Sequence, residues 1–240
     1  MKNAAIITGG GKRIGRAIAL ALAETGYDIA LHYNFSLDAA KDVAQQIDKI
    51  GSKCHLFSCD FNNMKQVALL MQQVFEVFPN CNLLINSASI FERARLMDTD
   101  EDTFDRHFNI NFKTPFFLSK NFAQYCKNGH VINILDTKIS KSSIEYFAYT
   151  LSKKALFEFT RMAARVLAPD IRVNGVCPGL ILPPPGQDEK YIDNMSKNIP
   201  LQQKGNVENI ISVVSFLIEN KFVTGECIFV DGGEHLNGLR

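Results

Sequence analysis

Short apolar runs alternate with longer amphipathic stretches along almost the whole chain. The runs are nearly continuous in Ala, Ile, Leu and Val, which is typical of strands buried on both faces of a sheet. They predict strands at 4–8, 28–33, 53–59, 82–85, 130–135, 171–176 and 227–230. The intervening stretches carry apolar residues three or four positions apart, which predicts helices at 14–25, 37–50, 63–78, 101–126, 146–168 and 206–220.

This alternation predicts an α/β fold. Parallel strands need crossover connections, which are right-handed in nearly all proteins, so we expect a doubly wound, seven-stranded parallel sheet of the Rossmann type with helices on both faces. No linker or repeat divides the sequence, so residues 1–240 are expected to form a single domain. The irregular stretch 180–200 contains Pro183, Pro184 and Pro185 and is expected to form a substrate flap; a plain surface insertion is the alternative.

Composition narrows the class of protein. The 240 residues carry a formal net charge of +1 without a basic tract, which gives no reason to expect a nucleic-acid partner. No apolar run is long enough to span a membrane, and the N-terminus passes directly into a strand, so we expect a cytoplasmic protein without a signal peptide. The six cysteines form no CxxC motif and are expected to be reduced thiols, not a metal site.

A glycine-rich turn, TGGGKRIG, follows the first predicted strand and opens the first predicted helix. In this context Gly9 permits a tight turn and Gly15 permits close approach of helix and backbone. The unpaired N–H groups at the helix N-terminus then suit a diphosphate, which predicts a dinucleotide-binding domain. A merely tight turn is the alternative.

The turn resembles the TGxxxGxG motif of the short-chain dehydrogenase/reductase family, except that Arg13 replaces the middle glycine. The variant TGxxKR[IL]G is similar to that of pteridine reductases. The resemblance implies that Arg13 reaches both the cofactor diphosphate and the substrate.

The end of the second strand bears on the choice of cofactor. No Asp or Glu stands at 32–37, where NAD-binding sites usually place an acid on the ribose 2′-hydroxyl. Lys12 can pair with a 2′-phosphate, and Asn34 and Ser36 can donate hydrogen bonds to it, so we expect NADPH. Pteridine reductases carry an arginine where this chain has Phe35. Ser36 is alternatively the N-cap of the next helix.

Further matches to the family extend over 4–233. Asp60 corresponds to an aspartate that binds the adenine amino group, with a helix N-cap as the alternative, and the stretch NSAS at 86–89 resembles the family's NNAG. Pro178 and Gly179 match a PG motif near the nicotinamide, and 230–233 match a C-terminal VDGG. The cofactor-binding residues are therefore expected to be Gly9, Lys12, Arg13, Ile14, Gly15, Tyr33, Asn34, Ser36, Asp60, Phe61, Asn86, Ala88, Lys153, Pro178 and Gly179.

Tyr149 and Lys153 stand four residues apart and share one face of a predicted helix. An adjacent ammonium lowers the pKa of a phenol, which makes it a better proton donor at neutral pH. A solvated helix face is the alternative for an isolated YxxxK. By resemblance, Asn111 is the family's helix asparagine in the proton relay; a satisfied polar group at a kink before Pro115 is the alternative.

Asp136 stands where most members of the family have serine, and pteridine reductases are similar in pairing an aspartate with YxxxK. Reduction of a pterin C=N bond needs a hydride on carbon and a proton on nitrogen, and a carboxyl group can relay that proton. Ser89 and Phe91 also match pteridine reductases, in which the phenylalanine stacks on the pterin. The alternatives are a loop or capping role for Asp136 and ordinary packing for Phe91.

Together these residues predict an NADPH-dependent oxidoreductase that acts on a pteridine. Asp136, Tyr149, Lys153 and Asn111 are the expected catalytic residues, and Arg13, Ser89, Phe91, Asp136 and Tyr149 are expected to bind substrate. A carbonyl reductase of a 3-oxoacyl thioester or small ketone is the first alternative, and a non-catalytic NADP-binding protein is the second. The resemblance also implies a homotetramer formed through 101–126 and 146–168.

Overall fold

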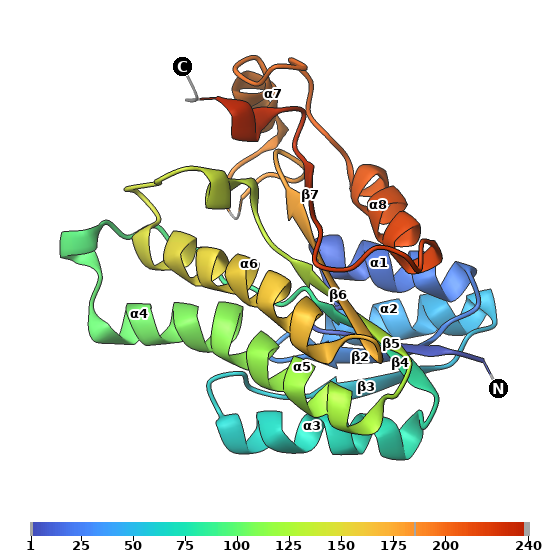
Figure 1. Ribbon diagram of the computed structural model, residues 1–240. Helices are drawn as coiled ribbons and strands as arrows, with labels where there is room; N and C mark the ends of the chain where they lie inside the picture. Colours follow the sequence, from blue (N-terminus) through green and yellow to red (C-terminus); the bar gives the residue numbers. More distant parts are fainter. Residues whose placement is uncertain (1, 185, 238–240) are drawn as a thin grey trace.

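The computed structural model describes residues 2–184 and 186–237. Within them, seven parallel strands form one sheet in the order β3-β2-β1-β4-β5-β6-β7 (Figure 1), as the sequence predicts. The strands are β1 Ala4–Ile7, β2 Asp28–Tyr33, β3 Cys54–Ser58, β4 Cys81–Asn86, β5 Gly129–Ile134, β6 Ile171–Pro178 and β7 Cys227–Val230.

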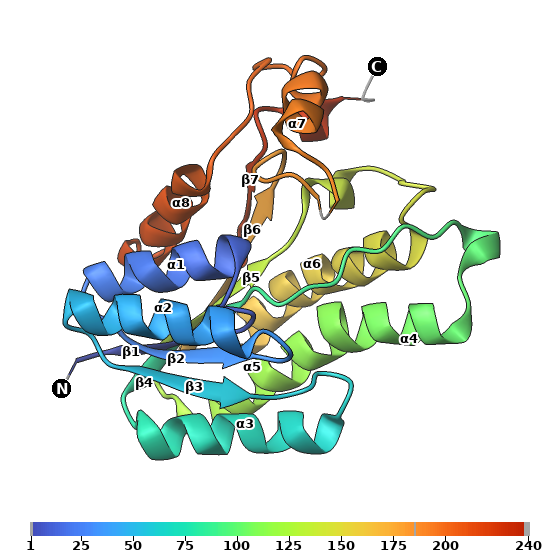
Figure 2. The same ribbon diagram turned by 180° about the vertical axis from the view of Figure 1, so that it is seen from behind.

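Helices cover both faces of the sheet. One layer contains α1, α2 and α8, and the other contains α3, α5 and α6 (Figures 1 and 2). The helices are α1 Arg13–Glu24, α2 Leu37–Ile50, α3 Met64–Val77, α4 Glu101–Phe108, α5 Thr114–Tyr125, α6 Phe147–Leu167, α7 Glu189–Ser196 and α8 Val207–Glu219. Short 3₁₀ turns lie at η1 Leu96–Asp98, η3 Thr137–Ser140 and η4 Glu234–Leu236, and η2 Asn109–Lys113 is a π-helical turn.

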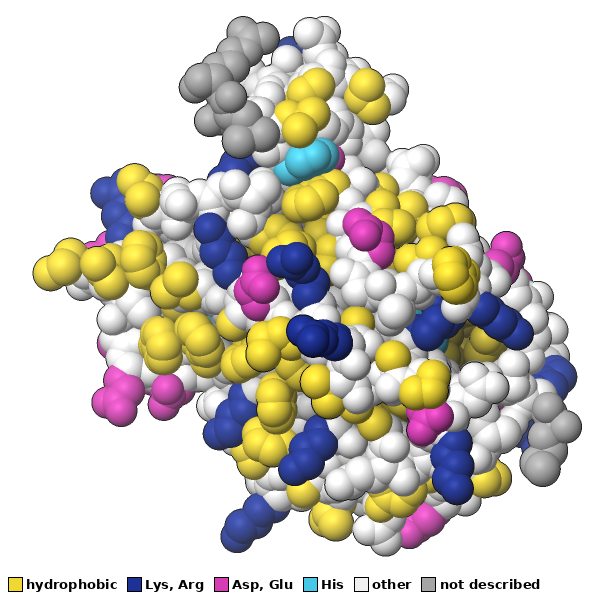
Figure 3. Space-filling model, viewed as in Figure 1, with side chains coloured by type: hydrophobic (Ala, Val, Ile, Leu, Met, Phe, Trp, Pro, Cys, Tyr) yellow, Lys and Arg dark blue, Asp and Glu magenta, His cyan; other side chains and the backbone are white. Residues whose placement is uncertain are grey.

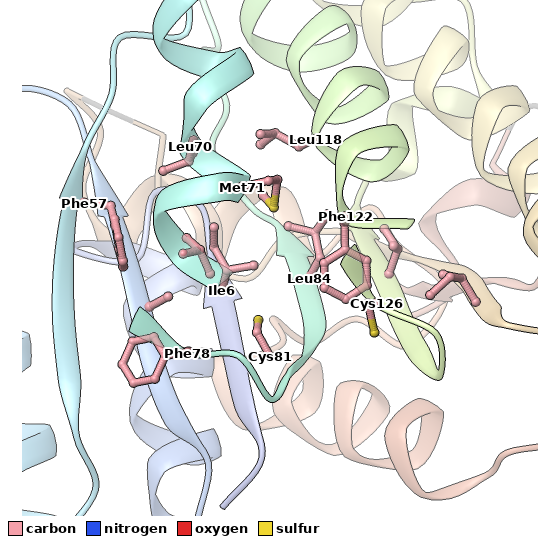
Figure 4. Close-up of a cluster of buried hydrophobic side chains, with 14 of the residues drawn as sticks. Ile6, Phe57, Leu70, Met71, Phe78, Cys81, Leu84, Leu118, Phe122 and Cys126 are labelled. Carbon is pink, nitrogen blue, oxygen red and sulfur yellow. The ribbon is translucent and has the colours of Figure 1, made fainter. Parts of the chain in front are cut away.

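The alternation of side chains along β1 explains the two layers. Ala4 and Ile6 belong to the core beneath α3, α5 and α6, whereas Ala5 and Ile7 belong to the core beneath α1, α2 and α8. All four are fully buried, as expected for a central strand of a parallel sheet. Figure 4 shows the first of these cores, in which Phe122 packs against the sheet.

The strand order reverses beside β1. The chain passes from β1 outward to β2 and β3 and then returns to β4 on the other side of β1. The loops after β1 and β4 therefore leave the sheet in opposite directions and open a crevice at its carboxyl edge. This crevice receives the glycine-rich turn.

The predicted helix 101–126 is interrupted just before Pro115, where the sequence analysis offered a kink as an alternative. The π-helical turn η2 separates α4 from α5. Pro115 lacks an N–H, and its ring crowds the carbonyl four residues earlier, that of Asn111, so regular α-helical bonding cannot continue through this point. The wider turn places Asn111 in the interior, fully buried.

The stretch 180–200 is not wholly irregular, because it contains α7. Asp188 caps that helix by accepting a hydrogen bond from the Tyr191 N–H, with N and O 3.1 Å apart. Pro185 lies outside the described residues. Within the described part of the chain, no helix is both long enough and apolar enough to cross a membrane.

Candidate active site

A cleft of about 1040 Å³ lies at the carboxyl edge of the sheet. Residues that follow β1, β2, β4, β5 and β6 line it, together with Tyr149 and Lys153 from α6. Tyr191 and Met195 of α7 also line it, so the stretch predicted to be a flap borders the cleft. The cleft therefore contains both the glycine-rich turn and the predicted catalytic pair.

The glycine-rich turn packs directly on the end of β4. Gly9 has a φ of +65°, and a Cβ on it would lie 2.9 Å from the Ala88 Cα. A Cβ on Gly15 would lie 2.5 Å from the Gly9 carbonyl oxygen. Both positions therefore require glycine, for the reasons the motif predicts. The Thr8 hydroxyl oxygen accepts hydrogen bonds from the N–H groups of Ser87 and Ala88 at 2.9 and 3.0 Å, which joins the two loops.

Arg13 has a backbone conformation that usually belongs to glycine. Its φ is +53°, and it is the first residue of α1. An L-residue in this region costs roughly 1–2 kcal/mol, so the chain retains strain at the position where the family has its middle glycine. The first turn of α1 contains no acidic residue, and Lys12, Arg13 and Ile14 line the cleft. This end of the helix suits an anion.

Beyond the turn, Tyr33, Asn34, Phe35 and Ser36 line the cleft at the end of β2. Ser36 occupies the N-cap position of α2, but its side chain makes no capping hydrogen bond. The Phe35 side chain is 92% exposed. The residues predicted to bind the 2′-phosphate thus line the same cleft as the glycine-rich turn.

Asp60 and Asn86 lie outside the residues that line the cleft, whereas Phe61 and Ala88 line it. The N-cap of α3 is Asn63, so the alternative role of Asp60 as a helix cap is wrong. Asp60 instead accepts a hydrogen bond from the Asn62 N–H at 3.0 Å.

Asn86 is buried at the end of β4. Its Nδ2 donates to the Asn133 Oδ1 at 2.8 Å, which links β4 to β5. Asn86 therefore stabilises the pairing of two strands beneath the cleft and does not itself line the cleft.

His32 is a residue that the sequence analysis passed over. Its Nδ1 accepts a hydrogen bond from the Gly9 N–H at 3.1 Å, and its Nε2 lies 2.9 Å from the Cys59 carbonyl oxygen. Because a carbonyl can only accept, the proton lies on Nε2. The ring stacks on Phe61 with centroids 4.1 Å apart. Burial lowers the pKa of His32 to about 4, despite the hydrogen bond to Cys59. A neutral histidine therefore joins the glycine turn to the end of β3.

Tyr149 and Lys153 lie on the buried face of α6, as their spacing predicts. The Tyr149 hydroxyl donates to Asp136 Oδ2 at 2.5 Å. Lys153 Nζ donates to the Ile134 carbonyl oxygen at 2.8 Å and lies 6.0 Å from the centroid of the Tyr149 ring. The structure therefore brings the three predicted residues together, with Asp136 in direct contact with the phenol.

The expectation that Lys153 lowers the pKa of Tyr149 is wrong for this structure. Burial raises the pKa of Tyr149 well above its ordinary value, and the negative charge and hydrogen bond of Asp136 raise it further. Burial also lowers the pKa of Lys153 to about 8, although Asp136 acts in the opposite direction. The phenol is accordingly held in its protonated form and oriented toward the carboxylate.

Asn111 uses its whole amide to fix the loop after β4. Its Oδ1 accepts from the Ile90 N–H at 2.9 Å and from the Ser89 hydroxyl at 3.0 Å. Its Nδ2 donates to the Ile90 carbonyl at 3.1 Å and to the Ser152 hydroxyl at 3.1 Å. A role in a proton relay stays a prediction, whereas these contacts place Asn111 behind the loop that carries Ser89 and Phe91.

Phe91 lines the cleft in contact with Tyr149, the predicted proton donor. Its ring stacks on Tyr146 with centroids 4.2 Å apart and meets the Tyr149 ring edge-on at 4.7 Å. Tyr146 is a second residue that the sequence analysis undervalued, because nothing in its neighbourhood along the chain marks it as part of the cleft. Lys138 Nζ lies 5.4 Å from the centroid of Phe91. Pro178 and Gly179 also line the cleft, at the end of β6.

Comparison with known proteins agrees with this geometry. The sequence model of a family described as enoyl-(acyl carrier protein) reductase matches residues 10–235. The chain is 30% identical to the 3-oxoacyl-(acyl-carrier-protein) reductase FabG of Staphylococcus epidermidis, over 98% of the chain and 100% of that protein. It is also 30% identical to pteridine reductase 1 of Leishmania tarentolae, over 97% of the chain and 96% of that protein.

Solved structures give the same result. FolM alternative dihydrofolate reductase 1 from Brucella canis, complexed with NADP, matches with a TM-score of 0.92 at 35% identity, over 97% of this chain and 93% of that one. The chain therefore belongs to the short-chain dehydrogenase/reductase family and is an oxidoreductase of that family.

Proposed function

We propose that this chain is an NADPH-dependent reductase of a pteridine C=N bond, with a dihydropterin or dihydrofolate as substrate. The observation that carries the proposal is the hydrogen bond from the Tyr149 hydroxyl to Asp136, with the Phe91 ring in edge-on contact with the Tyr149 ring. A carboxyl group at this position, together with Arg13 and Phe91, suits a flat, nitrogen-rich ring better than a simple ketone.

The chain's residues fit a dinucleotide. Gly9 and Gly15 would allow the backbone to approach a diphosphate, and the N-terminus of α1, which has no acidic residue in its first turn, would stabilise its charge. Lys12, Asn34 and Ser36 would hold the 2′-phosphate, which favours NADPH over NADH. When bound, the nicotinamide supplies the hydride. Relatives in complex with NADP support this choice of cofactor.

On the substrate side, Tyr149 would donate the proton to the ring nitrogen. The phenol carries its proton at neutral pH and shares it with Asp136 in a hydrogen bond, so the two side chains together would deliver the proton to the ring nitrogen. Asp136 orients that hydroxyl and accepts its hydrogen bond, and Lys153 supplies the nearby positive charge. Asn111 would hold the loop that carries Ser89 and Phe91, and Phe91 would stack on the pterin.

A carbonyl reductase is the second candidate. The relative from Staphylococcus epidermidis reduces a 3-oxoacyl thioester according to its name, and it covers the same length of chain. Tyr149 and Lys153 would serve a ketone equally well, and only Asp136, Arg13 and Phe91 favour the pterin.

One panel of substrates separates the two candidates. Oxidation of NADPH by the purified protein is followed at 340 nm with dihydrobiopterin, dihydromonapterin, dihydrofolate and an acetoacetyl thioester. We expect turnover with at least one of the three pteridines. Turnover with the thioester alone would establish the carbonyl reductase. NADPH binding without any turnover would overturn both in favour of a non-catalytic NADP-binding protein.

We also propose a cytoplasmic homotetramer. Hydrophobic side chains gather on the surface of α4 and α6 (Figure 3), and Phe104, Leu151, Met162 and Val166 are each at least 41% exposed there. Exposed apolar patches on a water-facing protein commonly mark an interface. Light scattering after size exclusion measures the mass directly, and a monomer at micromolar concentration would contradict this assembly.

A further inference from the structure

Asp231, in the VDGG segment that follows β7, makes contacts that the proposed mechanism does not use. It is 6% exposed. Its Oδ2 accepts a hydrogen bond from the Thr137 hydroxyl at 2.6 Å and from the His235 N–H at 2.8 Å. Its Oδ1 accepts from the Gly233 N–H at 3.0 Å. The His235 Nδ1 also lies 2.9 Å from Oδ2, so this buried carboxylate joins the distant Thr137 to the residues that directly follow Asp231.

Thr137 is the residue directly after Asp136 and is itself buried, at 2% exposure. It begins the short turn η3, and Asp136 caps that turn by accepting the Lys138 N–H on Oδ1 at 2.7 Å. The remaining oxygen, Oδ2, receives the Tyr149 hydroxyl. The position of Oδ2 relative to the phenol thus depends on the position of η3. The hydrogen bond from the Thr137 side chain to Asp231 holds η3 in that position.

Asp231 also contacts Gly179, which lines the cleft after β6. A Cβ on Gly179 would lie 2.5 Å from the Asp231 Cβ, so the two residues are in direct contact. Asp231 therefore contacts the turn that follows Asp136 through its carboxylate and the residue after β6 through its Cα and Cβ. In Figures 1 and 2 the segment after β7 runs beside α7 at one end of the molecule.

Asp231 is held in its charged form. Burial acts to raise its pKa, but the hydrogen bonds from Thr137, His235 and Gly233 outweigh burial and leave the pKa below its ordinary value. A charged acceptor forms a stronger hydrogen bond than a neutral one, so the hydrogen bond from Thr137 to the Asp231 carboxylate is strong.

We propose that Asp231 is a positioning residue for the catalytic pair, acting through the Thr137 hydroxyl to hold Asp136 Oδ2 against Tyr149. It does not touch the reacting atoms. The role rests on the reductase chemistry common to both candidate functions and not on the pterin, so any substrate that the wild-type protein reduces can serve in the test. Failure of the pterin assignment would leave the inference standing.

The test compares Thr137→Val with Thr137→Ser. Valine keeps the shape and removes the hydroxyl, and serine restores it. We expect kcat for Thr137→Val to fall by about tenfold or more, since displacement of a catalytic group by a fraction of an ångström is costly, with the Kd for NADPH changed by less than about twofold. Thr137→Ser should return kcat to within about threefold of wild type. Ser140→Ala is the matched control, because the Ser140 hydroxyl bonds the Thr137 carbonyl inside the same turn without contacting Asp231.

A spectroscopic measurement separates positioning from loss of fold. Tyrosinate absorbance at 295 nm is titrated in each variant and compared with the same variant carrying Tyr149→Phe. Displacement of Asp136 should lower the pKa of Tyr149 in Thr137→Val and leave it unchanged in Ser140→Ala. Wild-type kcat in Thr137→Val, or equal losses in the valine and serine variants with an unmoved tyrosine titration, would overturn the inference.

Discussion

The Tyr149 hydroxyl and the Asp136 carboxylate are in direct hydrogen-bond contact, with oxygens 2.5 Å apart, although thirteen residues separate them in the chain. Tyr149 comes from the buried face of α6 and Asp136 from the end of β5. A serine at position 136 would donate a hydrogen bond to a substrate oxygen, whereas an aspartate accepts one from the tyrosine. The contact therefore changes the orientation and the pKa of the Tyr149 hydroxyl and not only the shape of the cleft.

Replacement of Asp136 by serine should separate pterin from carbonyl reduction. We expect kcat/KM for the preferred pteridine to fall by about tenfold or more, because the phenol loses the group that orients it. The pKa of Tyr149 should fall toward its ordinary value, since Asp136 contributes to raising it. Stopped-flow turnover and the alkaline limb of the pH–rate profile measure the two effects. Asp136→Asn is the control that keeps the shape, and unchanged turnover in the serine variant would remove Asp136 from the mechanism.

Replacement of Arg13 by glycine should weaken ligand binding and leave the free energy of unfolding equal or slightly higher. Glycine adopts a φ of +53° without strain, so the variant should be as stable as wild type or up to about 1 kcal/mol more stable. Loss of the guanidinium should weaken ligand binding by about tenfold or more. Urea unfolding and NADPH fluorescence titration give the two quantities. Arg13→Ala keeps the strain and loses the charge, and equal stability of the alanine and glycine variants would show that the backbone is not strained.

Much of the site could be predicted because it depends on short-range rules. The i, i+4 spacing puts Tyr149 and Lys153 on one helix face, and the alternation of strands and helices puts position 136 at the carboxyl edge of the sheet beside them. Gly9 and Gly15 follow equally from local turn geometry. For these residues a pattern within a few positions determines the neighbour in space.

Other residues depend on contacts between distant segments, which one sequence does not specify. The bonds of His32 to Gly9 and Cys59 require the register of β1, β2 and β3. The raised pKa of Tyr149 depends on its burial and on the charge of Asp136, which the spacing of Tyr149 and Lys153 does not reveal. Asn63, and not Asp60, caps α3, because the helix begins at Met64 and the Asn63 side chain accepts hydrogen bonds from the N–H groups of its first turn.

Removal of the Asn111 amide should show whether Asn111 acts in a proton relay or holds the 89–91 loop in place. Asn111→Leu leaves the Ile90 N–H and C=O without their partners in the interior, which should lower the free energy of unfolding by about 3 kcal/mol. If Asn111 acts by holding the 89–91 loop, KM for the substrate should rise more than kcat falls. A large fall in kcat at constant KM would indicate the relay instead. Ser152→Ala, which removes only one partner of Asn111, should cost about 1 kcal/mol.

Protonation of His32 should make the protein acid-labile. Its folded-state pKa is about 4 against 6.5 for an exposed histidine, so between these values the unfolded chain binds a proton that the native chain does not. Stability is therefore fully present above pH 6.5 and is lost as the pH falls toward 4. Urea unfolding at pH 7 and pH 4.5 should show that wild type loses about 2 kcal/mol more than His32→Gln over this interval. Glutamine does not titrate, and its side-chain oxygen can accept the Gly9 N–H. His130, whose pKa burial lowers to about 3, contributes equally to both proteins and cancels in the difference. If the free energy of unfolding depends on pH in the same way in both proteins, protonation of His32 is not the cause of the loss of stability.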